Sequence, residues 1–202
     1  RSESYDKDSR KPDVQYGDSL EGDLSRRDFT VNAMALELDG KDNLFIDPHN
    51  GMQDLIAKQL RTPGTPEQSF SDDPLRMMRA ARFAAQLDFT IAPEVRVAIT
   101  EMSARLQIIS SERIRDEFVK TLMSVNPRLG LTVMVETGLA AQFLPELPAL
   151  QLEIDEHHRH KDVYEHSLIV LEQAIDQEDR LGGPNLILRL AALLHDIGKP
   201  KT

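Results

Sequence analysis

The chain has 202 residues, of which 40% are hydrophobic and 29% are charged, and its formal net charge is -10. This length suits one or two domains and can bury a core without covalent cross-links. Cysteine is absent, which excludes disulfide frameworks, cysteine-ligated zinc, iron–sulfur clusters and cysteine nucleophiles. No apolar run approaches the ~20 residues that cross a bilayer, so we expect a cytoplasmic protein without a membrane partner. The acidic balance argues against a general DNA-coating protein, but a local basic groove for RNA remains open.

The ends of the sequence predict that it belongs to a longer protein. It begins at Arg1 without an initiator methionine, and it stops at Thr202, directly after an apolar helix that leads into His195 and Asp196. We therefore expect an internal piece of a larger chain, whose chemistry depends on residues outside it.

The first 62 residues predict the end of a small α/β domain. Residues 1–24 are polar and predict a mobile loop. The spacing of Ser25 and Asp28 resembles a capping box and predicts a helix from Ser25 to about Ala35. Residues 35–38 and 43–46 flank an Asp-Gly-Lys-Asp turn and predict a β-hairpin. A short helix over 52–59 follows, and Pro63, Gly64 and Pro66 predict a linker.

The pattern is helical from residue 72 onward. Apolar spacing, with prolines at the start of three segments, predicts helices over 73–87, 93–105, 110–124, 127–138, 162–178 and 185–196. Residues 143–150 and the histidine-rich residues 153–160 predict connectors. The expected fold is mainly α, with an α/β remnant over 1–62, a helical region over 63–150 and the opening of a second helical domain over 151–202.

The helix expected from residue 73 carries the first candidate site. At about 100° per residue, Arg76 lies within an apolar face and Asp73 lies about 60° away. A buried charge is costly unless it is paired or ligated. One interpretation is an Asp–Arg pair, three residues apart, that stabilises the start of the helix. The other is a pair of side chains that reads a nucleotide base.

The base-reading interpretation follows from hydrogen-bond donors and acceptors. The Asp73 carboxylate accepts from an exocyclic amine, and the Arg76 guanidinium donates to a ring nitrogen or a carbonyl. Cytosine and adenine both present an amine beside a ring acceptor, whereas uracil and guanine present a carbonyl and an N–H. One such pair would accept C and A and reject U and G.

The second candidate site is the run Arg26-Arg27-Asp28, with Asn32 one helical turn later. Two arginines beside a helix N-terminus suit a polyphosphate, and Asp28 and Asn32 suit ribose hydroxyls. The alternative is an exposed, charged helix start without a ligand.

The third group is an arginine series at three-residue steps, Arg76, Arg79 and Arg82. These side chains drift around their helix, so contacts to phosphate or RNA and salt bridges to neighbouring helices are both open. Arg113 and Arg115 stand among acidic residues and predict a structural network.

The fourth group is His166 with the adjacent His195 and Asp196. Imidazole and carboxylate ligands suit a divalent metal that generates hydroxide or binds phosphate. A cluster at His157, His158 and His160 either adds a ligand or belongs to a solvated connector, and we favour the connector.

Together these segments resemble the class II nucleotidyltransferases of the poly(A) polymerase family, and among them the bacterial CCA-adding tRNA nucleotidyltransferases. Residues 26–35 match the motif R-R-D-x-T-x-N-A, residues 47–51 match D-P-x-x-G, and residues 72–76 match E-D-x-x-R with Asp72 in place of Glu. Residues 111–120 fit the next helical motif. The similarity covers about residues 1–150, and the remainder resembles an HD-type phosphohydrolase domain.

The resemblance implies a helical neck between a truncated α/β nucleotidyltransferase head and the first helices of an HD-type all-α domain. It implies template-independent addition of C and A to the 3′ end of tRNA from CTP and ATP, assisted by Mg²⁺. Asp73 and Arg76 would read the base. The other nucleotide-binding residues would be Arg27, Asp28, Asn32, Arg79 and Arg82. His166, His195 and Asp196 would be part of an HD-domain site for a divalent metal.

The resemblance also implies what lies outside this sequence. The family's metal-binding D-x-D motif and glycine-rich loop would precede Arg1, and the last aspartate of the HD site would follow Thr202. We therefore expect that this piece alone neither adds nucleotides nor hydrolyses phosphates. The alternatives are a poly(A) polymerase or an A-adding or CC-adding relative, an HD-domain metal-dependent phosphohydrolase, and a non-catalytic RNA-binding module. The oligomeric state is not predicted.

Overall fold

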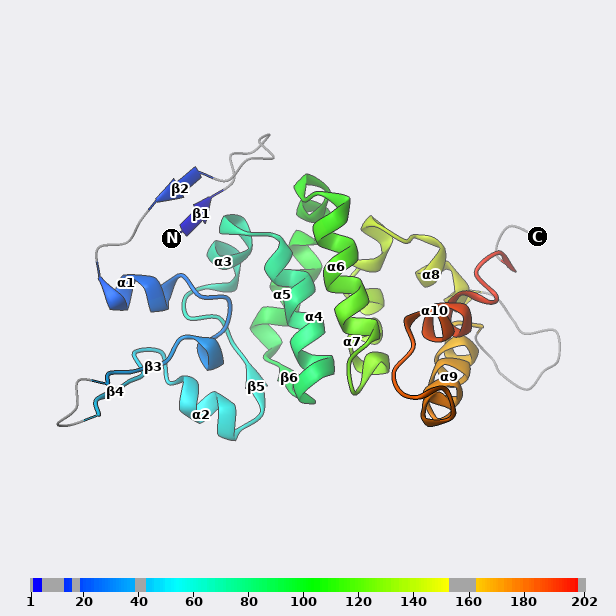
Figure 1. Ribbon diagram of the computed structural model, residues 1–202. Coiled ribbons are helices and arrows are strands. Elements are labelled where there is room, and N and C mark those ends of the chain that lie inside the picture. Colours follow the sequence, from blue (N-terminus) through cyan, green and yellow to red (C-terminus); the bar gives the residue numbers. More distant parts are fainter. Residues whose placement is uncertain (1, 5–12, 16–18, 39–42, 153–162, 200–202) are drawn as a thin grey trace.

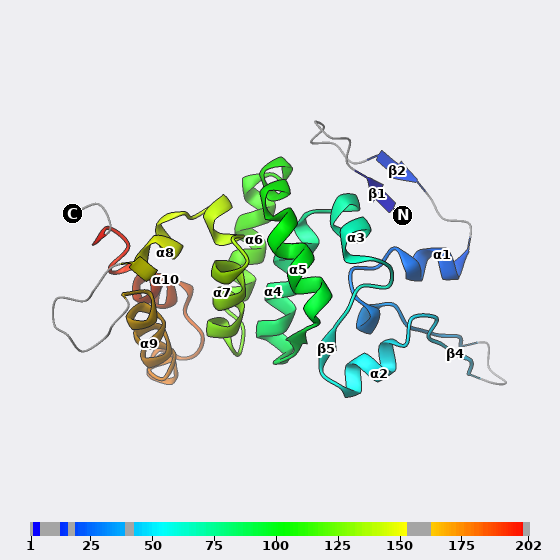
Figure 2. The ribbon, with the colours of Figure 1, turned by 180° about the vertical axis from the view of Figure 1, so that it is seen from behind.

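Helices dominate the computed structural model, which describes residues 2–4, 13–15, 19–38, 43–152 and 163–199. They form an elongated row with three parts (Figure 1). Short strands and helices occupy one end, α3 to α7 form the middle, and α8 to α10 form the other end; the view from behind shows the same order (Figure 2). This arrangement confirms the predicted mainly α fold class. None of the helices in the described ranges is both long and apolar enough to span a membrane.

The N-terminal part consists of short elements. Three two-stranded sheets are present in the described residues. They are the antiparallel pairs β1 (Ser2–Ser4) with β2 (Asp13–Gln15) and β3 (Ala35–Leu36) with β4 (Phe45–Ile46), and the parallel pair β5 (Gln59–Leu60) with β6 (Thr90–Ile91). The helices are α1 (Leu20–Ser25), the 3₁₀ helix η1 (Thr30–Asn32) and α2 (Gly51–Ile56). The predicted hairpin is confirmed, although its turn lies outside the described residues.

The predicted helix from Ser25 to Ala35 is wrong. Ser25 ends α1 instead of starting a helix, and the Ser19 hydroxyl caps α1 by accepting from the Gly22 amide at 3.1 Å. Phe29 is extended, with φ -134° and ψ 151°, and its side chain is fully buried. Burial of this ring in the core therefore outweighs the local capping signal. The predicted loop over 1–24 is also wrong where β1, β2 and α1 form.

The middle part is helical apart from β6, which lies between α4 and α5. Its elements are α3 (Pro66–Asp72), α4 (Leu75–Leu87), α5 (Pro93–Met102), the 3₁₀ helix η2 (Ser103–Ile108), α6 (Ser111–Leu122) and α7 (Pro127–Glu136). The helices predicted from residue 73 to 138 are confirmed within a few residues. The predicted linker instead contains α3, because the Thr65 hydroxyl accepts from the Gln68 amide and Pro66 occupies the first helical turn.

Helix α4 lies at the centre of the core and packs against both α6 and α7. Its buried side chains are small or flexible: Leu75, Met77, Met78, Ala80, Ala81, Ala84 and Ala85. On α7, a Cβ at Gly130 would lie 2.4 Å from Thr121 Cγ2 and 2.9 Å from Ala85 Cβ. This close packing holds α6 and α4 in a fixed relation, which matters because both helices contribute to the candidate site.

The C-terminal part packs two helices against the middle layer. Its elements are the 3₁₀ helix η3 (Ala140–Gln142), α8 (Glu146–Ala149), the 3₁₀ helix η4 (Leu150–Leu152), α9 (Val163–Ile175), the 3₁₀ helix η5 (Glu178–Leu181) and α10 (Leu186–Leu194). The predicted helices over 162–178 and 185–196 are confirmed with narrower bounds. Residues 153–162, with the expectations for His157, His158 and His160, lie outside the described residues.

A buried arginine joins the C-terminal part to the middle layer. Arg189 of α10 forms a two-pronged ion pair with Glu178, at 2.7 Å for each contact. Its Nη1 also donates to the carbonyls of Leu122 and Ser124, at 2.7 and 2.9 Å. These carbonyls belong to the end of α6 and the turn that follows it. One charged side chain thus fixes the junction between α6 and α10.

Candidate functional site

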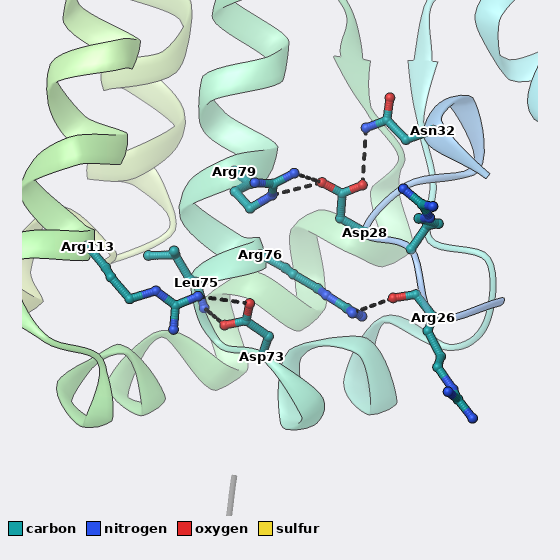
Figure 3. A pocket seen from close by; sticks show the side chains of 9 residues that line it. Arg26, Asp28, Asn32, Asp73, Leu75, Arg76, Arg79 and Arg113 are labelled. Carbon is teal, nitrogen blue, oxygen red and sulfur yellow. Dashed lines mark hydrogen bonds and ion pairs between the residues drawn. The ribbon is translucent and has the colours of Figure 1, made fainter. Parts of the chain in front are cut away.

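A cleft of about 510 Å³ lies where the N-terminal segment meets α4 and α6. Figure 3 shows its side chains converging from these elements. The lining residues are Arg26, Arg27, Asp28, Asn32, Asp73, Leu75, Arg76, Arg79 and Arg113. Five arginines against two aspartates make the cleft basic in a chain whose net charge is -10. Such a local field attracts an anionic ligand.

Asp28 links the N-terminal segment to α4. Arg79 donates from Nε (2.8 Å) and Nη2 to Asp28 Oδ2. Asp28 Oδ1 accepts from the Phe29 amide at 2.9 Å and from the Asn32 amide group at 3.1 Å. Burial raises the pKa of the Asp28 carboxyl, but the charge of Arg79 and the hydrogen bonds from Asn32, Arg79 and the Phe29 amide outweigh it, so the net pKa is lowered. Asp28 is therefore a buried anion, with Arg79 bound to one carboxylate oxygen and the Phe29 amide and Asn32 bound to the other.

The bonding of Asp28 bears on its predicted role as a sugar ligand. A carboxylate has about four acceptor positions, and protein donors already make four contacts to the two oxygens of Asp28. In this arrangement the carboxylate orients Arg79 and Asn32, and Asn32 is exposed on the cleft side. A ribose hydroxyl would bind Asp28 by displacing one of these donors.

Asp73 does not lie on a helix, although the predicted helix was expected to begin at residue 73. It occupies the turn between α3 and α4, with φ -146° and ψ 100°. Its Oδ1 accepts from the Leu75 amide at 3.0 Å, and its Oδ2 lies 3.4 Å from Arg113 Nη2. The predicted intrahelical pair with Arg76 is absent from the described contacts. Asp73 therefore contacts the start of α4 through the Leu75 amide, and the described contacts show no side-chain pair between Asp73 and Arg76.

Arg76 reaches across the cleft to the N-terminal segment. Its Nη1 donates to the Ser69 hydroxyl at 2.9 Å, and its Nη2 donates to the Arg26 carbonyl. Asp73 and Arg76 therefore line one cleft, in which the Asp73 carboxylate is turned toward Arg113 and the Arg76 guanidinium toward Arg26 (Figure 3). The described hydrogen bonds of Arg76 use Nη1 and Nη2 and do not involve Nε.

Arg82 is not among the residues that line this cleft. Its Nε lies 2.6 Å from Glu117 Oε2 on α6, and both side chains are nearly buried. Burial lowers the pKa of the Arg82 guanidinium, against the attraction of Glu117. The same guanidinium lies 4.2 Å from the centre of the Phe83 ring. For Arg82 the structure supports the salt bridge between helices and not the predicted nucleotide contact.

Arg113 lines the cleft and contacts Asp73, a partner 40 residues away that its acidic sequence neighbours did not indicate. Arg115 does pair locally, with Asp116. Residue 113 belongs to the helical motif that fits the family over 111–120, and that match is the sequence signal that could have placed it near the site.

The D-P-x-x-G segment, residues 47–51, supports the site through the packing of α2 against η1. Both oxygens of Asp47 accept backbone amides at the start of α2, from Gly51 at 2.7 Å and Met52 at 2.9 Å. A Cβ at Gly51 would lie 2.1 Å from the Thr30 carbonyl oxygen. Glycine is therefore required for α2 to pack directly against η1, which carries Asn32. This motif positions the cleft and does not line it.

The predicted metal group comes together at the other end of the molecule. One ligand atom from each of His166, His195 and Asp196 lies within 4.8 Å of the others. His195 Nδ1 lies 2.8 Å from the Ala192 carbonyl, so an N–H donated there leaves the Nε2 lone pair for a ligand. His195 Nε2 lies 3.3 Å from His166 Nε2 and 3.2 Å from Asp196 Oδ2. This donor set fits a divalent cation.

Comparison with known proteins bears on all three parts of the chain. The poly(A) polymerase head domain matches residues 1–61, a probable RNA and SrmB-binding site of polymerase A matches residues 88–150, and the HD domain matches residues 163–202. A CCA-adding enzyme of Levilactobacillus brevis is 44% identical over 156 residues, which cover 77% of this chain and 38% of the relative. This chain belongs to the poly(A) polymerase and CCA-adding nucleotidyltransferase family.

Other members of the family show both its structure and its range. The crystal structure of the Bacillus stearothermophilus CCA-adding enzyme in complex with CTP has a TM-score of 0.63 at 32% identity, covering 89% of this chain and 44% of that one. An A-adding tRNA nucleotidyltransferase of Deinococcus radiodurans is 40% identical over 189 residues, or 42% of its length. The chain thus spans about two fifths of the curated family members it matches.

Proposed function

We propose that this chain is part of an enzyme that adds C and A to the 3′ end of tRNA from CTP and ATP without a nucleic-acid template. The observation that carries the proposal is the placement of Asp73 and Arg76 in one basic cleft. The membership of the chain in a family that includes CCA-adding enzymes supports the same reaction.

The described contacts leave both side chains able to bind a base. Asp73 Oδ1 accepts one backbone amide and Oδ2 lies near Arg113, so acceptor positions remain for an exocyclic amine. Arg76 keeps Nε as a donor for the neighbouring ring acceptor. Cytosine and adenine offer an amine donor to the carboxylate and a ring acceptor to the guanidinium. Uracil and guanine would instead place a carbonyl acceptor against the carboxylate and an N–H donor against the guanidinium.

The basic side chains around this pair suit the rest of a nucleotide. Arg26 and Arg27 lie on the N-terminal side of the cleft, and Arg79 is held there by Asp28. Guanidinium groups bind phosphate oxygens through directed, charge-assisted hydrogen bonds. We assign the triphosphate to these arginines and the sugar to the side of the cleft near Asn32.

The proposed boundary between the head and neck parts lies between residues 62 and 63, and that between the neck and HD parts lies between residues 150 and 151.

Metal ions enter the proposal at two places. Magnesium would neutralise charge on the triphosphate during attack by the tRNA hydroxyl. In the described part of the chain, the only group of three or more potential metal ligands is His166, His195 and Asp196, so we expect the magnesium carboxylates elsewhere in the enzyme. The His–His–Asp group supports a second candidate activity, metal-dependent phosphohydrolysis by the HD part.

The test of the main proposal uses the full-length protein that contains these residues. It is given a tRNA that ends at the discriminator base, with CTP alone, ATP alone or both, and the products are sequenced. Addition of C-C-A with both nucleotides is expected. A protein that leaves this tRNA unextended but adds A to a second tRNA that already ends in CC would be an A-adding enzyme, and a long A tail would indicate a poly(A) polymerase; either result would overturn the CCA assignment.

The second activity is tested with the same preparation. Hydrolysis of a 2′,3′-cyclic nucleotide that requires added divalent metal, and that His195→Ala abolishes without affecting nucleotide addition, is expected. Hydrolysis that survives His195→Ala would show that the His–His–Asp group is not responsible.

A further inference from the structure

The Asp73 carboxylate, which would read the base, contacts a side chain from another helix. Asp73 lies in the turn before α4, where the Leu75 amide fixes Oδ1 at 3.0 Å. A carboxylate fixed at one oxygen can still rotate, and the direction of its remaining acceptor positions changes with that rotation. The second oxygen therefore decides where the carboxylate points.

Arg113 provides the contact at that second oxygen. Its Nη2 lies 3.4 Å from Asp73 Oδ2, and its side chain lines the same cleft at 39% exposure. A guanidinium restricts the plane of a carboxylate because its own donors are planar and fixed in direction.

The guanidinium approaches from a rigid element. Arg113 is the third residue of α6. This helix lies against α4, pairs with it through Glu117 and Arg82, and buries Ile114 and Phe118 in the core. The far end of α6 is fixed by Arg189, which donates to the Leu122 carbonyl. The position of Arg113 relative to Asp73 is therefore set by the helical core and not by a surface loop.

We propose that Arg113 is a positioning residue, which orients the Asp73 carboxylate and thereby sets which bases the cleft accepts. This inference rests on the proposed function, because base selection is meaningful only if the cleft binds a nucleotide. Loss of Arg113 leaves Asp73 in place but free to rotate, so a uracil or guanine carbonyl no longer meets a fixed opposing carboxylate. Selectivity should fall more than overall activity.

The experiment measures kcat/KM of the full-length protein for CTP, ATP, UTP and GTP on the appropriate tRNA ends. Arg113→Ala is expected to reduce the preference for CTP over UTP, and for ATP over GTP, by at least about tenfold, as loss of one charged hydrogen bond allows. Arg113→Lys should recover part of the preference. Arg115→Ala is the matched control, because Arg115 lies on the same helix and pairs with Asp116 at the surface.

A double-mutant cycle separates positioning from direct contact. If Arg113 acts through Asp73, Arg113→Ala should reduce selectivity no further in the Asp73→Ala background. Additive losses would overturn the inference. So would an equal loss of kcat/KM for all four nucleotides, which is the signature of a phosphate contact.

The outcomes distinguish this inference from the function on which it rests. A wild-type protein that adds no nucleotide overturns the proposed function and this inference with it. A wild-type protein that adds C and A, combined with unchanged selectivity in Arg113→Ala, overturns the role of Arg113 alone. If Arg113→Ala does not fold, Arg113→Gln keeps the stem of the side chain and removes the charge, with the same expected loss of selectivity.

Discussion

Arg79 and Asp28 lie 51 residues apart in the chain, and they form the ion pair that closes one side of the cleft. Arg79 belongs to α4, whereas Asp28 belongs to the short segment between α1 and η1. The pair is flanked by an edge-to-face contact of Phe29 with Phe83, whose ring centres are 5.7 Å apart. The shape of the cleft therefore depends on how firmly this segment is held against α4.

Asp28→Asn should loosen that attachment. The variant keeps the size of the side chain, but it removes the charge opposite Arg79, whose side chain is 34% exposed. We expect a loss of about 1–3 kcal/mol in the free energy of unfolding, together with weaker binding of CTP and ATP. Urea unfolding followed by circular dichroism measures the first effect. Unchanged stability would show that the pair contributes nothing to the fold.

The same pair predicts a dependence of stability on pH. The folded protein lowers the pKa of Asp28 below its ordinary value of 3.8. The contribution to stability is therefore complete above the unfolded pKa and is lost as the pH falls through the folded pKa. As the pH falls from about 5 to about 2, wild type should lose more stability than Asp28→Asn. Parallel pH profiles for the two proteins would contradict the assignment.

Gly51→Ala should disturb the cleft from a distance. The new Cβ would lie 2.1 Å from the Thr30 carbonyl oxygen, so α2 and η1 must separate. We expect destabilisation by about 1–3 kcal/mol and weaker nucleotide binding. Gly64→Ala is the matched control, because a Cβ at Gly64 would have no neighbour within 4 Å. Equal effects of the two substitutions in thermal unfolding would refute the packing argument.

Arg189→Ala should be the most damaging of these substitutions. It removes the donor of two backbone carbonyls and the ion-pair partner of the buried Glu178 carboxylate, which keeps the Asn185 amide. Loss of one partner from a buried ion pair costs about 3–5 kcal/mol. Arg180→Ala, at an exposed position of η5, serves as the control. Denaturant unfolding compares the two. A small effect of Arg189→Ala would mean that the junction between α6 and α10 does not depend on this side chain.

Divalent metal should stabilise the protein through the His–His–Asp group. A ligand that binds only the folded state at 100 times its dissociation constant adds about 2.7 kcal/mol. We expect Mn²⁺ or Ni²⁺ to raise the melting temperature of wild type but not of His166→Ala. His49→Ala is the control, because His49 lies elsewhere and contacts Ser25. Retention of the metal effect in His166→Ala would exclude this site.

The helices from α4 onward were predictable because their signals are local. Prolines open α5 and α7, and apolar spacing marks the buried faces of α4 and α6. The path from Ser25 to Ala33 was not predictable from its own residues, because burial of Phe29 against Phe83 decides it. The parallel pair of β5 and β6 depends on strands that lie about 30 residues apart, and two-residue strands carry no periodic signal.

The candidate site was predictable in composition but not in detail. Asp73, Arg76, Arg27, Asp28, Asn32 and Arg79 all line one cleft, as the motifs suggested. Arg82 pairs with Glu117, and Arg113 pairs with Asp73 at the cleft, because the tertiary arrangement of α4 and α6 decides which acidic side chain each arginine meets. Neighbouring charges in the sequence could not distinguish these partners.

The most direct test of the central claim is the nucleotide preference of Asp73→Ala in the full-length protein, measured as kcat/KM for CTP, UTP, ATP and GTP. Asp72→Ala serves as the control, because the Asp72 carboxylate accepts from Gln68 and is not among the residues lining the cleft. If Asp73 reads the base, its variant should lose the preference for C over U and for A over G, while Asp72→Ala keeps it. Discrimination by Asp73→Ala that equals that of wild type would contradict the base-reading role.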